Sequence, residues 1–229
     1  MTDLTILYYT DNSLPSRFAA AVRAHLIASA GKAGGIPIVS ISQRPIDFGH
    51  NVCLGDIGRS YRSILRQIAA GCLACETEFV ALCEHDVLYP PEHFFLRPVK
   101  GEVVFDQNRH RALMDCRRFS VDRGGRSMQL VIAERAVLLM DAVAKLVRCF
   151  FDEDFHDAFE PGKGSETLGI AKIEYEMLAA PGPGILDLVN HGGNYAPCKR
   201  HSGRLVKRLD PWGTVEDVMT TYFIGGKAG

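Results

Sequence analysis

The sequence lacks the features that would place a protein across a membrane or on an oxidising secretory route. No run reaches the roughly 18 apolar residues needed to span a bilayer, and Met1 to Asp3 carry neither the basic nor the apolar region of a signal peptide. The seven cysteines are an odd number and do not have the spacing of a disulfide framework. We therefore expect a soluble, cytoplasmic protein of a reducing compartment, without a membrane partner.

The chain also lacks a net charge of either sign, since 26 Lys and Arg residues stand against 27 Asp and Glu residues. This balance excludes the overall positive field that marks many nucleic-acid binders. Basic residues are instead gathered in two stretches, one from Arg109 to Arg126 and one from Lys199 to Arg208. Such stretches are solvated faces or phosphate contacts, so a nucleic acid is a candidate partner.

Strands and helices alternate in the first part of the chain. Short apolar runs predict strands at residues 4–9, 36–41 and from 79 onwards, and periodic apolar residues predict helices at 18–30 and 60–75. This order predicts an α/β fold, a mixed and mostly parallel Rossmann-type sheet flanked by helices. Without repeats or a Gly- and Ser-rich linker, we expect a single domain over residues 1–229.

The second part of the chain shows a different pattern. We expect a loop at 42–58, short strands at 102–105 and 111–114, amphipathic helices at 134–150 and 165–179, a shaped loop at 151–164, a strand at 185–189, and a basic, partly ordered tail.

The run beginning at Phe79 ends in Glu84-His85-Asp86, and Pro90 and Pro91 then stop it. Open α/β sheets bind ligands outside the carboxyl ends of such strands. Acids at alternate residues share one side of a strand, which predicts that His85 faces away and packs. Two carboxylates in this position suit a divalent metal that holds a diphosphate. The alternative is that both acids cap the turn at Pro91.

This arrangement resembles the GT-A glycosyltransferase fold. The resemblance lies in Tyr9-Thr10-Asp11-Asn12 after the first strand, a helix, and a strand that ends in acid-x-Asp. The segment QIAAGCLACETEFVALCEHDVLYPPEHF is similar to the GT-A helix, connection and metal-binding strand end, although Glu84 departs from the usual aspartate. The resemblance covers residues 4–95 and a patch at 185–195. It implies a nucleotide-sugar-binding half at 1–98, an acceptor-side half at 99–200 and a tail at 201–229.

The resemblance implies a metal-dependent transfer of a sugar from a UDP-sugar or similar donor to an acceptor hydroxyl. Asp86 would then bind Mn2+ or Mg2+, and Glu84 would orient the ribose or a metal-bound water. His191, after the last predicted strand, would be a second metal ligand and would favour Mn2+. The alternative for His191 is a histidine in a surface turn.

Several polar residues are candidates for contacts with the donor. By resemblance, Thr10, Asp11 and Asn12 would contact the base and ribose, or they cap the following helix. Gln43 stands in a similar place after the second strand. Ser60, Ser63 and Gln67 recur at helical spacing and face either the nucleotide-sugar or solvent.

An inverting glycosyltransferase needs a carboxylate base to take the acceptor proton. Asp157 and Glu160 are the candidates, in an acidic and aromatic loop at residues 152–162. A retaining enzyme would not need this base, so the stereochemistry stays open.

The acceptor is equally open between a polysaccharide, a lipid-linked sugar, a small molecule and a flipped-out hydroxylated base in DNA. A sugar nucleotidyltransferase is a second candidate function. Such an enzyme would carry a Gly- and Arg-rich loop after the first strand, where this chain has Thr10-Asp11-Asn12-Ser13. A metal-dependent hydrolase and a non-catalytic binding module are the others.

Overall fold

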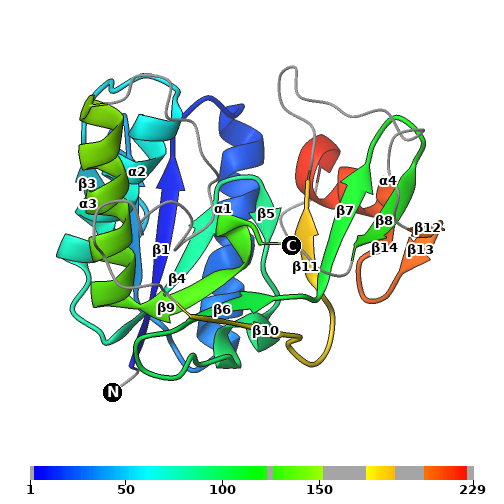
Figure 1. The fold of residues 1–229 in the computed structure, drawn as a ribbon. Coiled ribbons are helices and arrows are strands. Elements are labelled where there is room, and N and C mark those ends of the chain that lie inside the picture. Colours follow the sequence, from blue (N-terminus) through cyan, green and yellow to red (C-terminus); the bar gives the residue numbers. More distant parts are fainter. Residues whose placement is uncertain (1–2, 123–125, 152–173, 189–203, 226–229) are drawn as a thin grey trace.

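The computed structural model describes residues 3–122, 126–151, 174–188 and 204–225. Two main β-sheets stand beside each other, with helices packed against them (Figure 1), and a third sheet has only two strands. In chain order the first half contains β1 (Leu4–Thr10), α1 (Ser16–Lys32), β2 (Ile38–Ser42), β3 (His50–Cys53), α2 (Tyr61–Ala74), β4 (Phe79–Glu84), β5 (Val87–Leu88) and the 3-10 helix η1 (Pro91–Phe95).

The second half is richer in short strands. It contains β6 (Val103–Asp106), β7 (Arg109–Leu113), β8 (Arg118–Asp122), the 3-10 helix η2 (Met128–Leu130), β9 (Val131–Glu134), α3 (Arg135–Phe151), β10 (Tyr175–Leu178), β11 (Ile185–Asp187), β12 (Arg204–Val206), β13 (Arg208–Leu209), β14 (Gly213–Thr214), α4 (Val215–Val218) and the π-helix η5 (Met219–Gly225).

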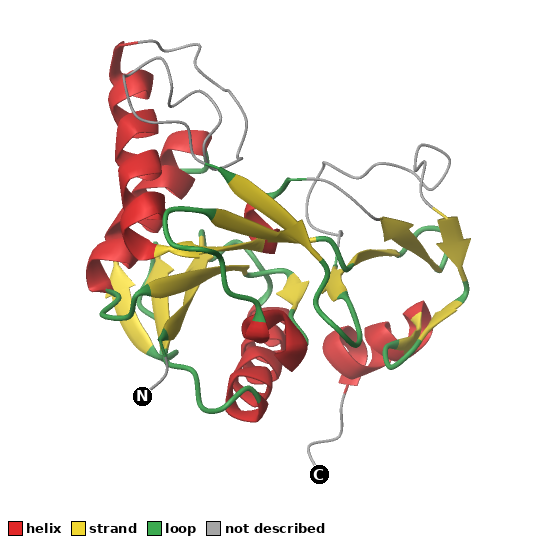
Figure 2. Cartoon of the chain, turned by 60° about the horizontal axis from the view of Figure 1, so that its bottom comes forward, coloured by secondary structure: helices red, strands yellow, loops and turns green. Residues whose placement is uncertain are grey.

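The larger sheet has the order β10-β6-β9-β4-β1-β2-β3. Only β9 runs antiparallel to its neighbours β4 and β6, so the sheet is mixed and mostly parallel, as predicted. Helices α2 and α3 cover one face and α1 covers the other (Figures 1 and 2). The connection from β1 leads to β2 on one side, while β4 lies on the other side. The carboxyl ends of β1 and β4 therefore flank the switch point where such sheets bind ligands.

The smaller sheet has the order β12-β8-β7-β11-β5 and packs on α4 and η5 (Figure 1). Register explains this packing: Ala112 lies opposite Phe119 and the two side chains share a buried face. Phe18 and Val22 of α1 complete this second core. The other face carries Arg109, Arg111 and, through the neighbouring strand, Asp187. Helix α1 thus contacts both cores.

Several predicted elements were wrong. The predicted loop at 42–58 contains β3, an edge strand, and the predicted helix at 165–179 contains β10. Residues 204–225 of the predicted tail form the elements from β12 to η5. The predicted turn between the strands near 105 and 111 is instead a crossing from one sheet to the other. The strands β8 and β9 were not predicted at all.

Two details of membrane and redox chemistry follow from the structure. Within the described ranges, the helices are too short or too polar to cross a membrane. Cys116 is disulfide-bonded, whereas the sequence pattern predicts no disulfide. The other cysteines of the described residues, Cys53, Cys72, Cys75, Cys83 and Cys149, are free.

Candidate functional site

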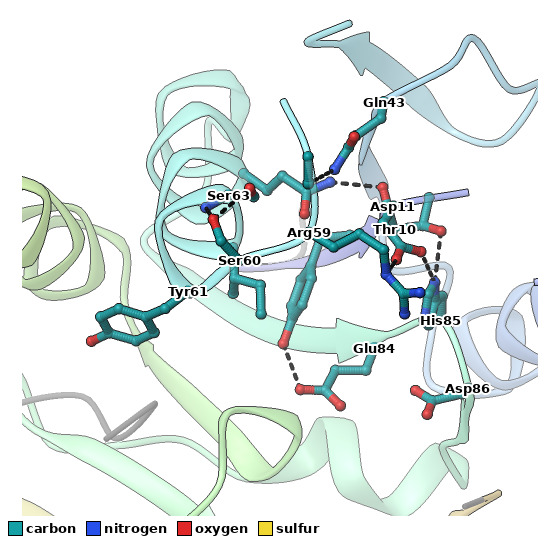
Figure 3. A pocket seen from close by; sticks show the side chains of 14 residues that line it. Thr10, Asp11, Gln43, Arg59, Ser60, Tyr61, Ser63, Glu84, His85 and Asp86 are labelled. Carbon is teal, nitrogen blue, oxygen red and sulfur yellow. Dashed lines mark hydrogen bonds and ion pairs between the residues drawn. The ribbon is translucent and has the colours of Figure 1, made fainter. Parts of the chain in front are cut away.

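A pocket of about 340 Å³ opens at the carboxyl ends of β1 and β4 (Figure 3). Its size suits a small organic ligand. The lining residues come from the end of β1, the position after β2, the loop before α2 and its first turns, and the end of β4 with the turn that follows: Tyr9, Thr10, Asp11, Gln43, Gly58, Arg59, Ser60, Tyr61, Ser63, Ile64, Gln67, Glu84, His85 and Asp86. The pocket therefore lies at the switch point of the larger sheet.

All three residues of the acid triplet line this pocket. The expectation that His85 faces away and packs was wrong. Strand β4 ends at Glu84, so His85 and Asp86 belong to a turn and the alternation of a strand no longer applies to them. The Nδ1 atom of His85 lies 2.7 Å from Thr10 Oγ1 and 3.6 Å from Asp11 Oδ1. The turn thus brings the histidine against the end of β1.

The two carboxylates of the triplet are held in a setting that disfavours charge. Glu84 Oε1 accepts a hydrogen bond from the Tyr9 hydroxyl at 2.8 Å. Burial raises the pKa of Glu84 to about 7, with the charge of Asp187 acting in the same direction and the Tyr9 hydrogen bond opposing it. Burial, and then the charges of Glu84 and Asp187, raise the pKa of Asp86 well above its ordinary range. A cation beside Asp86 would relieve this repulsion.

The opposite wall of the pocket is the amino-terminal end of α2. Ser60 caps this helix, because its side chain accepts a hydrogen bond from Ser63 N at 3.1 Å. Arg59 comes directly before the cap; its side chain is 65% exposed and forms an ion pair with Asp11. Free backbone N–H groups and a helix dipole at such an end attract anions. One wall is therefore acidic and the other is suited to phosphate.

Three predicted donor-site residues line the pocket but use their polar groups to hold backbone. The Gln43 amide donates to Gly58 O at 2.6 Å and accepts from Ile57 N at 3.2 Å. Gln67 donates to Thr10 O at 2.7 Å, and the Ser63 hydroxyl donates to Ile57 O at 2.8 Å. These contacts fix the loop before α2 and the end of β1. The pocket is therefore shaped by its own polar side chains.

Asn12 and Asp11 do not cap α1, which begins after Pro15 without a side-chain cap. Asn12 has a φ of 58° and its Oδ1 accepts from the backbone N–H groups of Gln43 and Arg44, each at 2.8 Å. It thereby ties the end of β1 to the end of β2. Asp11 Oδ1 accepts from Ser13 N at 3.0 Å. Burial opposes the charge of Asp11, but the Ser13 hydrogen bonds, His85 and Arg59 together lower its pKa.

The donor chemistry of the acid triplet fits Mn2+ or Mg2+. These cations prefer oxygen ligands and keep several waters, so one or two carboxylates and a substrate phosphate suffice. Among the residues that the structure describes, no group of three or more His, Cys, Asp or Glu side chains is arranged to hold a metal. Asp86, which burial and neighbouring carboxylates disfavour as an anion, is the residue that a cation would suit best.

The predicted site residues and the residues that line the pocket do not coincide fully. Asp157, Glu160 and His191 lie outside the described residues. Arg59 and Tyr61 also line the pocket, and neither was predicted as a site residue. A glycine and an arginine immediately before a capped helix were a usable signal for Arg59. Tyr61, the first residue of α2, had no such signal.

No family model and no curated protein matches this sequence. Solved structures do match. A glycosyltransferase involved in the glycosylation of the major capsid of PBCV-1 superposes with a TM-score of 0.52 at 10% identity, over 82% of this chain and 94% of the other.

Two weaker likenesses are glycosyltransferases as well. S. aureus TarS in complex with UDP-GlcNAc gives a TM-score of 0.48 at 10% identity, over 85% of this chain and 60% of the other. A Drosophila β-1,4-galactosyltransferase 7 mutant, in complex with manganese, UDP-Gal and xylobiose, gives 0.45 at 9% identity, over 82% of this chain and 71% of the other.

The likeness to the PBCV-1 protein extends over nearly the whole of that chain. At such low identity it establishes the architecture and not the reaction. The mixed, mostly parallel sheet, its flanking helices and this match agree with one another. The chain therefore has a GT-A-like glycosyltransferase fold.

Proposed function

We propose that this protein is a metal-dependent glycosyltransferase that moves a sugar from a nucleoside-diphosphate donor, a UDP-sugar in the first instance, to an acceptor hydroxyl. The observation that carries the proposal is the polarity of the pocket. The neighbouring carboxylates of Glu84 and Asp86 stand on one side, and the amino-terminal end of α2 with Arg59 stands on the other. A diphosphate with a bound cation matches both walls at once.

Each wall has a role in this proposal. Asp86, with His191 as a second candidate ligand, would hold Mn2+ or Mg2+. The metal, when bound, supplies Lewis acidity that stabilises the diphosphate leaving group. Arg59 and the N–H groups at the start of α2 bind phosphate oxygens. Thr10, Asp11 and the loop held by Gln43 surround the nucleoside, and Glu84 orients the ribose or a water.

The acceptor side is proposed from sequence alone. Asp157 or Glu160 would take the proton of the acceptor hydroxyl if the enzyme inverts the anomeric centre. A hydroxylated base in DNA stays a candidate acceptor because exposed basic residues such as Arg204 and Arg208 lie on β12 and β13. Phosphate contacts of this kind would make DNA binding fall steeply as salt rises. A salt titration of DNA binding tests this part by itself.

The experiment for the donor site is calorimetry with UDP, with and without MnCl2. We expect UDP to bind only with the metal, and Asp86→Asn to weaken this binding on the order of 100-fold, because charge stabilisation worth several kcal/mol is lost. Asp47→Asn is the matched control. It removes the same charge from an exposed residue that does not line the pocket, and binding should stay as in the wild type.

Metal-independent UDP binding, or wild-type binding by the Asp86→Asn variant, would overturn the proposal. A screen of nucleotide-sugars for hydrolysis with Mn2+ then identifies the donor. The same screen includes UTP with sugar 1-phosphates. Release of pyrophosphate there, without hydrolysis of any nucleotide-sugar, would instead identify a sugar nucleotidyltransferase.

A further inference from the structure

A buried ion pair on the smaller sheet points toward the acid triplet. Asp187 of β11 accepts a hydrogen bond on Oδ2 from Nη2 of Arg109 at 2.9 Å. The side chains are only 13% exposed for Arg109 and 9% exposed for Asp187. Leu188, directly after β11, also donates a backbone hydrogen bond from its N–H to Asp86 O at 3.0 Å. The smaller sheet is therefore joined to the turn that carries Asp86.

Gln129 of η2 lies between Arg109 and the acid triplet, and it is 3% exposed. A guanidinium has only donors and a carboxylate only acceptors, so the amide must turn its oxygen to Arg109 and its nitrogen to Glu84. In that orientation the oxygen accepts from Arg109 Nε at 2.8 Å, and the nitrogen donates to Glu84 Oε2 at 3.2 Å. The opposite orientation would bring the nitrogen 3.3 Å from Asp187 Oδ2 but would set donor against donor at Arg109.

Glu84 is thereby held at both carboxylate oxygens. Tyr9 donates to Oε1 at 2.8 Å and Gln129 donates to Oε2. The backbone N–H of Glu84 in turn donates to the Tyr89 hydroxyl at 3.0 Å. A carboxylate with both oxygens occupied has one orientation. The contacts run without a break from Asp187 through Arg109 and Gln129 to Glu84.

We propose that Arg109 is a positioning residue of the donor site, which acts through Gln129 to fix the carboxylate of Glu84 beside Asp86. This inference rests on the proposed function, since it assigns Glu84 a role in binding a nucleotide with its metal. Arginine suits the position because its rigid fork donates to Asp187 and Gln129 at the same time. A lysine would keep the charge but not this geometry. Partners that orient a metal-site residue are typically worth about 10- to 100-fold in affinity or activity.

The alternative is that the contacts from Asp187 through Arg109 and Gln129 to Glu84 only fasten the smaller sheet to the larger one. A double-mutant cycle separates the two readings. The variants are Arg109→Lys, Gln129→Met and the double variant, and the control is Arg117→Lys. Arg117 is 71% exposed and lies 3.5 Å from Glu216, away from the contacts described above. The readouts are the Kd of UDP in the presence of MnCl2, measured without turnover well below each melting temperature, and the Tm.

Positioning predicts that Arg109→Lys and Gln129→Met each raise the Kd of UDP roughly tenfold or more. The double variant should bind UDP no more weakly than the weaker-binding single variant, because both changes break the same series of contacts. A fastening role predicts a lower Tm with the Kd unchanged, and that result overturns the inference. Additive effects, or an Arg109→Lys Kd equal to that of Arg117→Lys, overturn it as well. In these cases the wild type still binds UDP with metal, so the proposed function stands; wild-type protein that binds no UDP with metal removes both.

Discussion

Helix α2 packs so closely on β1 that a single methyl group added at the contact should destabilise the protein. Gly71 faces Leu7, and a Cβ atom at Gly71 would lie 2.5 Å from Leu7 Cδ1 and 2.6 Å from its Cγ. Leu7 is fully buried on the central strand β1, between β2 and β4, so its side chain would have to shift within the core. The change Gly71→Ala therefore tests how tightly α2, whose amino-terminal end lines the pocket, packs on β1.

Two effects of opposite sign compete in this variant. Alanine favours a helix interior over glycine by about 1 kcal/mol. Overpacking a filled core costs about 1 to 3 kcal/mol. The contact distances are well inside those of real carbon atoms, so we expect the cost to be near the upper part of its range and the free energy of unfolding to fall by about 1 to 2 kcal/mol.

Urea denaturation of the variant and of Gly31→Ala measures this difference. Gly31 lies in α1, and a Cβ atom there would meet nothing within 4 Å. Only the helix preference acts at Gly31, so that variant should be as stable as the wild type or up to about 1 kcal/mol more stable. If Gly71→Ala matches Gly31→Ala, the close packing of α2 on β1 is not what the distances indicate.

Three further predictions concern single side chains. Burial lowers the pKa of His25 in the folded protein, more than its bond to Tyr89 O raises it. The unfolded chain then binds a proton below about pH 6.5 that the folded chain resists, so stability is complete above that pH and falls as pH drops. Thermal denaturation from about pH 7.5 to about pH 5 should show a smaller fall for His25→Gln; an equal fall contradicts the argument. Ser60→Ala should cost about 1 kcal/mol in urea denaturation through loss of the α2 cap, and an unchanged midpoint would show that the cap is dispensable. Asn12→Ala leaves two backbone N–H groups without their acceptor and should lower stability by about 1 to 3 kcal/mol on the same assay, whereas a neutral result would mean that water replaces the side chain.

The larger sheet was predictable because its inner strands are short apolar runs in the sequence. Strands β1 and β4 are buried on both faces, so nearly every residue is apolar. Helix α3 was predicted from its periodicity. The edge strand β3 was missed because its residues, His50 to Cys53, are half exposed and show neither a run nor an alternation.

The pocket was predicted in part for a similar reason. Residues at the ends of apolar strands, such as Thr10 and Asp86, follow from the topology alone. The place of His85 did not follow, because it depends on where β4 stops, and Glu84 and Asp86 looked the same in a strand or in a turn. The positions of Gln129 and Asp187 near Glu84 were not predictable either. They approach Glu84 only through contacts between η2, β11 and β4, which lie far apart in the sequence.

The hydroxyl and amide groups around the pocket have one more consequence. Gln43, Gln67 and Ser63 are already engaged with main-chain atoms before any ligand arrives. The entropy lost in ordering this rim is therefore spent when the chain folds and not when a nucleotide enters. A ligand therefore meets a rim that is already ordered. Its residence time should depend more on how well it fits this rim than on how far the rim can rearrange.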